Sequence, residues 1–296
     1  MKMFQKTIIA LALAGGCSGA FAGQFYLDLT GTANGGGNLG VGDSMTGLKN
    51  EATVQYNSNT IIDAGGDGVV GVGDALTTTG GLNVGGVFNV ANFDSNHVTG
   101  FDPGSDSEGI TNDSTIIDDA TGGAWGLSFS MNLVGEVAAM SGLAVESVEY
   151  TGGLIEVWLI REDGAGGIEA VNAFDMTVTG SDPSNPENFL IYGNVSFSGN
   201  EPAAVRDLFH YNGKTCGGAG DSFYDLANCV PPVEIAFVID QNLNNVVPVA
   251  GPGQNEFTIA GDHDGSIVFV VPEPATLFLM GGSLLGLGLS RRRLSK

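Results

Sequence analysis

The segment with the clearest potential for chemistry is acidic and rich in glycine, and it runs from Asp63 to Asp74. Aspartate occupies its first, fifth and twelfth positions, and Val69 is its seventh residue. Calcium takes six to eight oxygen ligands, and this spacing can direct the carboxylates of Asp63, Asp67 and Asp74 and the Val69 carbonyl toward one point. We therefore predict a weak calcium site. The alternative is a turn that joins two strands.

The same spacing resembles the calcium loops of EF-hand and dockerin proteins, and the resemblance implies calcium as a cofactor. Two features depart from that pattern. Gly65 supplies no side-chain oxygen at the third position, and Asp74 is shorter than the glutamate usual at the twelfth. The flanking residues also have the character of strands, whereas an EF-hand loop lies between helices.

Other reactive residue types are few. His97, His210 and His263 are far apart in the sequence, so we expect surface or turn positions for them, with Asp262–Gly265 forming a hairpin turn. The sequence contains no Gly-x-Ser-x-Gly elbow, His-Glu-x-x-His motif or phosphate-binding glycine loop. We therefore predict a protein that is not an enzyme. A secreted hydrolase that uses a carboxylate pair is the alternative.

Two cysteines, Cys216 and Cys229, lie in the body of the chain. An even pair at this spacing in an exported protein favours a disulfide. The bridge would close the loop 217–228 and stabilise the fold by about 3 kcal/mol in the chain-entropy picture. A free-thiol or metal-binding role for the pair is the alternative.

The last 25 residues combine three features in a fixed order. Pro272-Glu273-Pro274 comes first, an apolar run from Ala275 follows, and Arg291, Arg292 and Arg293 lie near the end. The prolines keep the backbone extended, so a helix would begin near Ala275. Its length to Ser290 is roughly 24 Å, short of a hydrocarbon core of roughly 30 Å. Snorkelling arginines would permit a thin crossing, with the basic end in the cytoplasm.

This tail resembles the PEP-CTERM sorting signal of Gram-negative bacteria. The resemblance implies recognition by an exosortase, which is a membrane-embedded cysteine transpeptidase. It further implies removal of a single transmembrane helix and export that is often coupled to exopolysaccharide. The site residues that it implies are Pro272, Glu273, Pro274, Arg291, Arg292 and Arg293. An ordinary C-terminal tail anchor is the alternative.

At the other end of the chain, Lys2 and Lys6 precede a short apolar run, and Ala20-Phe21-Ala22 precedes Gly23. This pattern is typical of a signal peptide over residues 1–22 that signal peptidase removes. Without the two targeting segments, four basic and 32 acidic residues remain, a formal charge of −28. A surface with this charge repels nucleic acid and attracts divalent cations, so we expect no nucleic-acid partner.

Strand patterns dominate the body, residues 23–271. Apolar and polar residues alternate in several segments with glycine, asparagine or aspartate between them. We predict strands at 25–29, 125–133, 148–150, 154–160, 170–179, 189–197, 233–239, 257–260 and 267–271, with a tight turn at Thr151-Gly152-Gly153. Residues 202–210 form the one weak helix candidate in the body. The pattern predicts an all-β domain, specifically a β-sandwich of jelly-roll type with long Gly/Asp-rich loops.

Together these observations predict a three-part chain: a signal peptide (1–22), the β domain (23–271) and a sorting tail (272–296). The precursor would be tethered in the inner membrane and then sorted to the cell surface or the extracellular space. The function that the tail implies is a structural component of biofilm, floc or exopolysaccharide matrix. The alternative is a polysaccharide-binding adhesion module that uses Trp125, Trp158, Tyr150 or Tyr192. Core packing is the competing explanation for both tryptophans.

Overall fold

The computed structural model of the chain describes residues 24–28, 48–99, 125–162, 168–184, 189–212, 216, 222–241, 246–253 and 255–271. Residues 22–270 form one compact unit, and the description below concerns that unit. The predicted signal peptide and sorting tail lie outside the described residues. None of the helices in the described part of the chain is long and apolar enough to cross a membrane.

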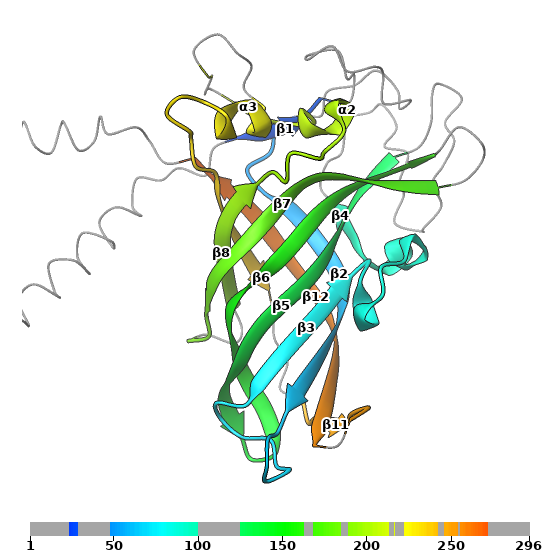
Figure 1. Cartoon of the computed structure of the whole chain (residues 1–296), viewed down its shortest axis with the longest axis vertical. Helices are drawn as coiled ribbons and strands as arrows, with labels where there is room; N and C mark the ends of the chain where they lie inside the picture. The colour runs from blue at the N-terminus through cyan, green and yellow to red at the C-terminus, as the bar shows by residue number, and fades with distance from the viewer. Residues whose placement is uncertain are drawn as a thin grey trace, which may run out of the picture. The chain divides into compact units, whose positions relative to one another are not determined.

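The unit is built almost entirely of antiparallel strands (Figure 1). Its strands are β1 (Phe25–Leu27), β2 (Ala52–Asp63), β3 (Ala75–Gly81), β4 (His97–Thr99), β5 (Trp125–Ser141), β6 (Ala144–Glu162), β7 (Ile168–Asp182), β8 (Phe189–Ser196), β9 (Phe209–Tyr211), β10 (Ala236–Gln241), β11 (Val249–Ala250) and β12 (Glu256–Val270). The helical segments are short: η2 (Val84–Gly86), η3 (Val90–Ser95), α2 (Ala203–Arg206) and α3 (Phe223–Ala227). The predicted all-β character is confirmed.

The main sheet closes on itself. Its order is β12-β10-β8-β7-β6-β5-β3-β2, and β2 pairs again with β12 along Ala52–Asp63. The shared strand β12 pairs with β10 through Gly265–Val270 and with β2 through Glu256–Ile267. Where two packed sheets of a jelly roll were expected, the structure therefore has one closed sheet. The physical reason is that long, twisted strands of 12–19 residues, such as β2 and β6, coil far enough for the first and last strands to meet.

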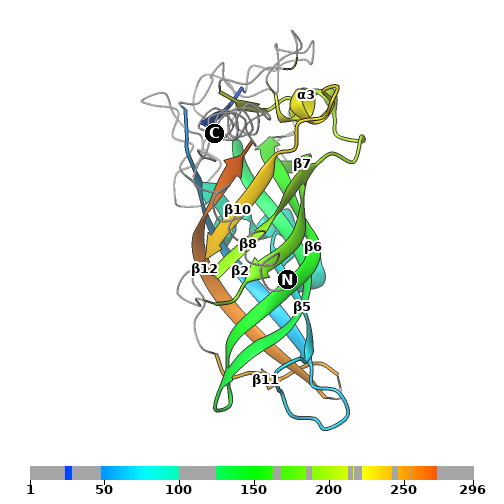
Figure 2. The ribbon, with the colours of Figure 1, turned by 90° about the vertical axis from the view of Figure 1, so that its left-hand side faces the viewer.

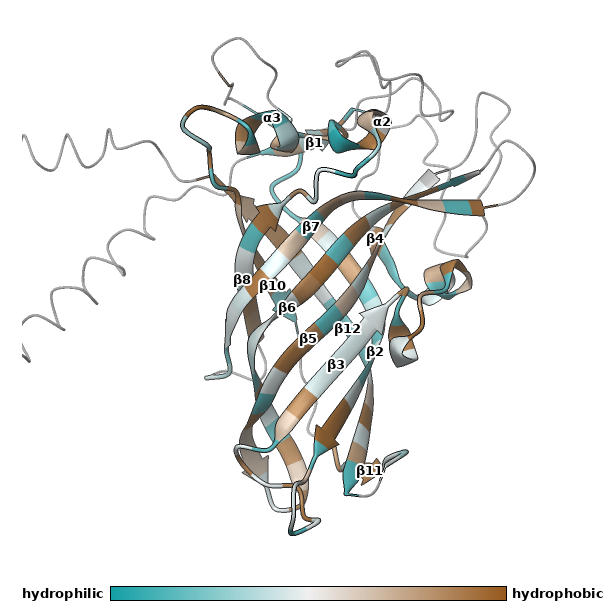
Figure 3. Cartoon of the chain, viewed as in Figure 1, coloured by the Kyte–Doolittle hydropathy of each residue, from teal (hydrophilic) through white to brown (hydrophobic). Residues whose placement is uncertain are grey.

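Closure gives each strand an inner and an outer face. In β2 the side chains alternate without exception between buried and more exposed positions. In β5 the apolar residues Leu127, Phe129, Met131 and Leu133 face inward and are buried, as their alternation predicts. Alternating hydrophilic and hydrophobic bands along these strands are visible in Figure 3.

One end of the closed sheet is filled by aromatic rings. Phe209, Phe223 and Phe269 pack against both Phe174 and Phe25, with ring centroids 4.8 Å apart for Phe174 and Phe209 and 5.1 Å apart for Phe25 and Phe269. All five side chains are buried. They join β1 and α3, which lie together at this end (Figure 1), and β9, which pairs with β1, to the sheet wall. Edge-to-face contacts of this kind add to the free energy that burial of the rings provides.

The predicted turn at Thr151-Gly152-Gly153 is wrong, because these residues lie inside the continuous strand β6. The two strands of the hairpin are instead β5 and β6, and the turn is at Ser141–Ala144. Gly153 has φ +135°, and a Cβ there would lie 2.4 Å from the Asn132 carbonyl oxygen. The glycines therefore permit an irregularity in strand pairing near Gly135, which is where the β5–β6 register shifts.

Two further local predictions are also wrong. Asp262–Gly265 is part of β12 and not a turn, because both of its sides are paired within the sheet over part of its length. Of the predicted helix 202–210, only Ala203–Arg206 is helical, and the chain becomes extended again in β9. Tertiary pairing outweighs the local turn and helix preferences at these positions.

Candidate functional site

A group of polar side chains interrupts the sheet interior, between the aromatic cluster and the buried apolar residues Ile62 and Leu76. Ser58 and Thr60 of β2, Thr78 of β3, Tyr150 of β6 and His263 of β12 meet here, although they are up to 205 residues apart in sequence. A cavity of about 240 Å³ adjoins them. Its lining consists of Ser58, Thr60, Val145, Glu146, Ser147, Val148, Tyr150, Val246, Ile259, Ala260, Gly261, Asp262 and His263.

The cavity exists because the sheet wall is incomplete on one side. β8 and β10 have only eight and six residues, whereas β6 has 19 and β12 has 15. β6 and β12 continue past the ends of the two short strands, as Figure 2 shows. Val246 partly bridges the gap through backbone hydrogen bonds to Val145, with N–O distances of 3.0 and 3.4 Å. Among the residues that the structure describes, the rest of this side of the cavity stays open to solvent.

Hydrogen bonds fix the polar side chains around the cavity. The Ser58 hydroxyl lies 2.7 Å from Nε2 of His263. The Thr60 and Thr78 hydroxyls are 2.7 Å apart, and the Tyr150 hydroxyl donates to Thr78 Oγ1 at 3.0 Å. A hydroxyl offers one donor and two acceptor positions, so these bonds leave hydrogen-bonding capacity unused. The arrangement can therefore bind another polar group without first being dismantled.

Tyr56 and Gln241 separate the polar cavity from the apolar part of the interior. The Tyr56 hydroxyl donates to the Gln241 side-chain oxygen, and both residues are buried. The Tyr56 ring packs against the His263 imidazole and the Phe129 ring, with centroids 4.8 and 5.2 Å away. His263 is consequently held from one side by Tyr56 and from another by Ser58.

Both buried tyrosines are neutral at physiological pH. Burial raises the pKa of Tyr150 to about 12, although hydrogen bonds with Thr78 and Thr60 oppose the shift. Burial also raises the pKa of Tyr56 well above 10, and the neighbouring Tyr150 adds to the effect. The two phenols therefore serve as neutral hydrogen-bond donors beside the cavity.

The raised pKa values predict that the fold loses stability in alkali. Unfolded tyrosine ionises near pH 10, whereas folded Tyr150 holds its proton to about 12, so its contribution is complete below pH 10 and is lost as pH rises through 12. Two pH units correspond to about 3 kcal/mol. Urea unfolding between pH 9 and 12 should show this fall, and Tyr150→Phe should make it shallower. An equally steep fall in the variant would contradict the assignment.

The predicted calcium ligands each engage their own loop. Oδ1 of Asp63 accepts from the Gly65 amide at 2.9 Å, Oδ1 of Asp67 from the Val69 amide at 3.1 Å, and Oδ2 of Asp74 from the Gly71 amide at 2.7 Å. Across the described segments, no three His, Cys, Asp or Glu side chains gather in a way that could hold a metal ion. The structure therefore does not bring the three carboxylates together, and the calcium site stays a prediction.

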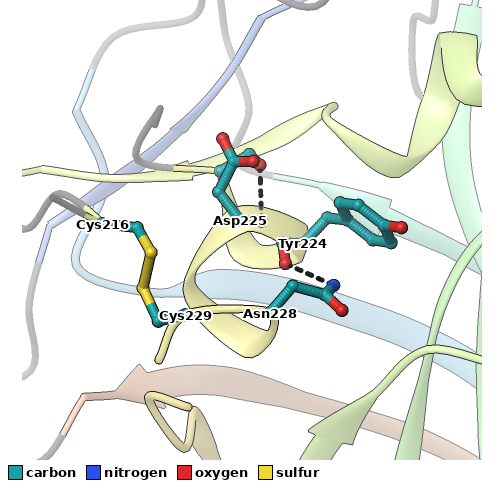
Figure 4. Close-up of a disulfide and its surroundings, with 6 residues drawn as sticks. Cys216, Tyr224, Asp225, Asn228 and Cys229 are labelled. Carbon is teal, nitrogen blue, oxygen red and sulfur yellow. Dashed lines mark hydrogen bonds between the residues drawn. A yellow bond between two sulfur atoms is a disulfide. The ribbon is translucent and has the colours of Figure 1, made fainter. Parts of the chain in front are cut away.

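The predicted disulfide is confirmed. Cys216 and Cys229 are bonded, with Cα atoms 5.6 Å apart. Figure 4 shows the bridge beside α3, where Ser222 caps the helix by accepting from the Asp225 amide at 3.0 Å. The Asn228 side chain donates to the Tyr224 carbonyl at 2.8 Å and closes the other end. The bridge thus secures the short helix that contributes Phe223 to the aromatic cluster.

The aromatic candidates for sugar binding differ in their surroundings. Tyr150 is buried, and half-buried Trp158 donates from Nε1 to Ser130 Oγ at 3.0 Å and packs against Phe88 at 4.8 Å. Tyr192 is 42% exposed, but its hydroxyl donates to the Ser181 carbonyl. The side chain of Trp125 lies outside the described part of the structure. Trp158 therefore serves packing, as its alternation in the strand suggests, whereas Tyr150 is buried beside the polar cavity.

Sequence reasoning did not identify the cavity residues Ser58, Thr60 and His263. In β2 the inward positions change from apolar Val54 to polar Ser58 and Thr60. The alternation of apolar and polar residues is therefore lost where the strand lines the cavity. The remaining signal was the long run of β-branched and polar residues before Asp63, which is typical of a strand. His263 was hidden because its Asp and Gly neighbours resemble a turn.

Comparison with known proteins identifies the tail. A family model described as the PEP-CTERM protein-sorting motif matches residues 270–293. A search of curated proteins and a search of solved structures found no match. The matched segment contains the Pro272-Glu273-Pro274 sequence and the three arginines, all outside the described residues. The chain therefore carries a PEP-CTERM sorting motif and is an exported surface protein that an exosortase sorts.

Proposed function

We propose that the protein is a non-enzymatic structural component of an extracellular matrix, such as a biofilm, a floc or an exopolysaccharide layer. The observation that carries the proposal is the PEP-CTERM motif over residues 270–293, which begins at the last residue of β12. An exosortase that acts on this tail would deliver the folded domain outside the cell. Signal peptidase would first remove residues 1–22, and the inner membrane would hold the precursor through its C-terminal helix.

The charge of the domain also supports a matrix role. The domain 23–271 has only four basic residues against 32 acidic ones. Copies of the domain therefore repel one another and remain dispersed. Divalent cations, calcium among them, would reduce this repulsion and allow copies to approach within the matrix. The same charge disfavours nucleic acid as a partner.

The closed sheet supports a passive, durable role. β2 and β12, which would be the edges of an open sheet, pair with each other, so few backbone groups remain unpaired for aggregation. The disulfide adds a further restraint suited to an oxidising environment. Sugar binding on an exposed aromatic surface receives less support, because Tyr150 is buried and Trp158 Nε1 already donates a hydrogen bond to Ser130 Oγ.

Deletion of the gene in the producing bacterium tests the proposal. We expect a matrix that is weaker or less abundant, and restoration by the complete chain but not by a chain that lacks residues 272–296. Immunoblots should find the protein in the isolated matrix fraction. An unchanged matrix in the deletion strain, or a protein confined to the culture supernatant, would contradict the matrix role.

A further inference from the structure

The polar cavity lies inside the closed sheet, whereas the sorting motif is matched over residues 270–293, none of which lines the cavity. Interiors of closed sheets of this size are normally filled by side chains or hold one small ligand. Here about 240 Å³ is unfilled, the volume of about eight water molecules at roughly 30 Å³ each. The hydroxyls beside it are ordered by hydrogen bonds to one another, which is the arrangement of a prepared binding site.

The lining restricts the charge of a ligand. Among the described residues the lining contains no Lys or Arg, so no permanently charged cation offsets the charge of an anion, which the acidic domain would also repel. Its two carboxylates belong to half-buried Glu146 and exposed Asp262. The deeper residues Ser58, Thr60 and Tyr150 are neutral, so a buried ammonium group would lose its hydration without a counter-charge. A neutral ligand fits this distribution best.

The lining also restricts the polarity of a ligand. Ser58, Thr60, Tyr150 and His263 offer donors and acceptors in close alternation, which suits a molecule with several hydroxyl groups. The aliphatic side chains of Val145, Val148 and Ile259 line the same space and suit the C–H face of a ring. A molecule that combines both features and has about 12 non-hydrogen atoms fits the space of about eight waters.

We propose that this cavity binds one neutral monosaccharide unit, either free or at the end of a glycan chain. A matrix polysaccharide as the source rests on the proposed function, whereas the binding itself does not. The ring would enter through the gap below β8 and β10, between β6 and β12. Its hydroxyls would bind Ser58, Thr60 and His263, while Val148 and Ile259 contact its carbons.

Gly261 is the positioning residue in this arrangement. It pairs with Ser58 across the β2–β12 ladder, and a Cβ at this position would lie 2.9 Å from Nε2 of His263. The absence of a side chain therefore lets the imidazole reach the Ser58 hydroxyl. Gly261→Ala should displace His263 and weaken sugar binding without removing any hydrogen-bonding group.

The test uses purified protein comprising residues 23–271 and isothermal titration with a panel of probes. Neutral hexoses and N-acetylhexosamines are compared with glucuronate, glucosamine and hexylamine. We expect at least one neutral sugar to bind with a Kd on the order of 1 mM, as a ligand of this size allows. Glucuronate and both amines should bind at least tenfold more weakly. Absence of binding by every neutral sugar, or tighter binding of an amine, would overturn the proposal.

Matched variants connect binding to the cavity. Thr60→Val removes an inner hydroxyl at nearly constant shape and should weaken the best sugar at least tenfold. Thr77→Val makes the same change on the outer face of β3, where the residue is exposed, and should leave the Kd unchanged. Equal losses in the two variants, or none in Thr60→Val, would overturn the assignment. If Thr60→Val does not fold, methyl NMR of the wild-type domain is the deciding measurement. Added sugar must then shift the methyl signals of Val148 and Ile259, and unchanged signals would overturn the assignment.

Titration with the methyl glycoside of the best sugar identifies the source of the ligand, because the glycoside imitates the end of a glycan chain. Equal binding of the glycoside and the free sugar identifies a glycan terminus as the ligand. Binding of the free sugar alone identifies a small molecule from the medium, and the proposed cavity stands in both cases. These titrations are independent of the deletion experiment, so a failure of sugar binding and a failure of the matrix role can be told apart.

Discussion

Simultaneous replacement of Pro272, Glu273 and Pro274 by alanine should leave nearly all of the protein uncleaved in the membrane fraction. The reason is that this tripeptide is the distinctive element of the matched motif, and its two prolines disfavour a helix at the site where the enzyme would have to reach the backbone. Mass spectrometry of the wild-type extracellular protein should show a chain that begins near Gly23 and lacks residues 277–296. Recovery of an intact tail from the extracellular fraction of the wild type would contradict sorting by cleavage.

The arginine cluster supplies the matched control. Arg291, Arg292 and Arg293 changed together to lysine keep the positive charge that orients the tail, whereas the same residues changed to alanine lose it. We expect the lysine variant to be sorted normally or nearly so. The alanine variant should be held poorly at the membrane before processing. Equal defects in both would indicate that the enzyme reads the guanidinium groups themselves, and charge would then not be the deciding property.

The strands that the sequence predicts well are those whose inward positions are all apolar. The run from Trp125 to Leu133 lies in β5, and 170–179 lies in β7. β2 was anticipated only as residues of strand character before the acidic segment and was given no bounds, although it is 12 residues long. Its inward residues include Ser58 and Thr60, which face the cavity and interrupt the apolar alternation. The same polarity that makes this strand functionally interesting conceals it from pattern analysis.

Glycine accounts for the errors in connectivity. Gly152-Gly153 and Asp262–Gly265 have the composition of turns, yet both segments lie within long strands. At Gly153 and Gly265 a Cβ would lie 2.4 and 1.9 Å from a backbone oxygen of the neighbouring strand. Glycine is therefore needed for close approach of two backbones, a requirement that only the folded sheet imposes. Without the strand pairings, close approach and a tight turn have the same sequence signature.

The site residues divide along similar lines. The disulfide pair was predictable because only two cysteines remain in the body of the chain, and the sorting residues because they are contiguous. The cavity was not predictable, because Ser58 and His263 are 205 residues apart and meet only when β12 pairs with β2. The closing pair of strands is a property of the whole sheet, and no local segment encodes it.

Gly193→Ala should be among the most damaging single-methyl additions in the domain. Gly193 lies in β8, opposite Phe237 of β10 and Val178 of β7. A Cβ there would be 1.9 Å from the Thr177 carbonyl oxygen and 2.9 Å from the Phe237 ring, distances that no relaxed structure tolerates. The backbone of β8 must shift away, so hydrogen bonds on one side of the strand lengthen. We expect a loss of roughly 3 kcal/mol in the free energy of unfolding.

Gly66→Ala is the matched control, because the same methyl group would meet nothing within 4 Å in the loop between β2 and β3. Both substitutions restrict the unfolded chain equally, which by itself favours folding by about 0.4–1 kcal/mol. Gly66→Ala should therefore be neutral or slightly stabilising, while Gly193→Ala lowers the thermal midpoint by roughly 6–12 °C for a domain of this size. Calorimetry of the two variants separates the contributions. Equal midpoints would mean that β8 can move away from β7 at little cost, and that the short strands beside the cavity are not held rigidly in the wall.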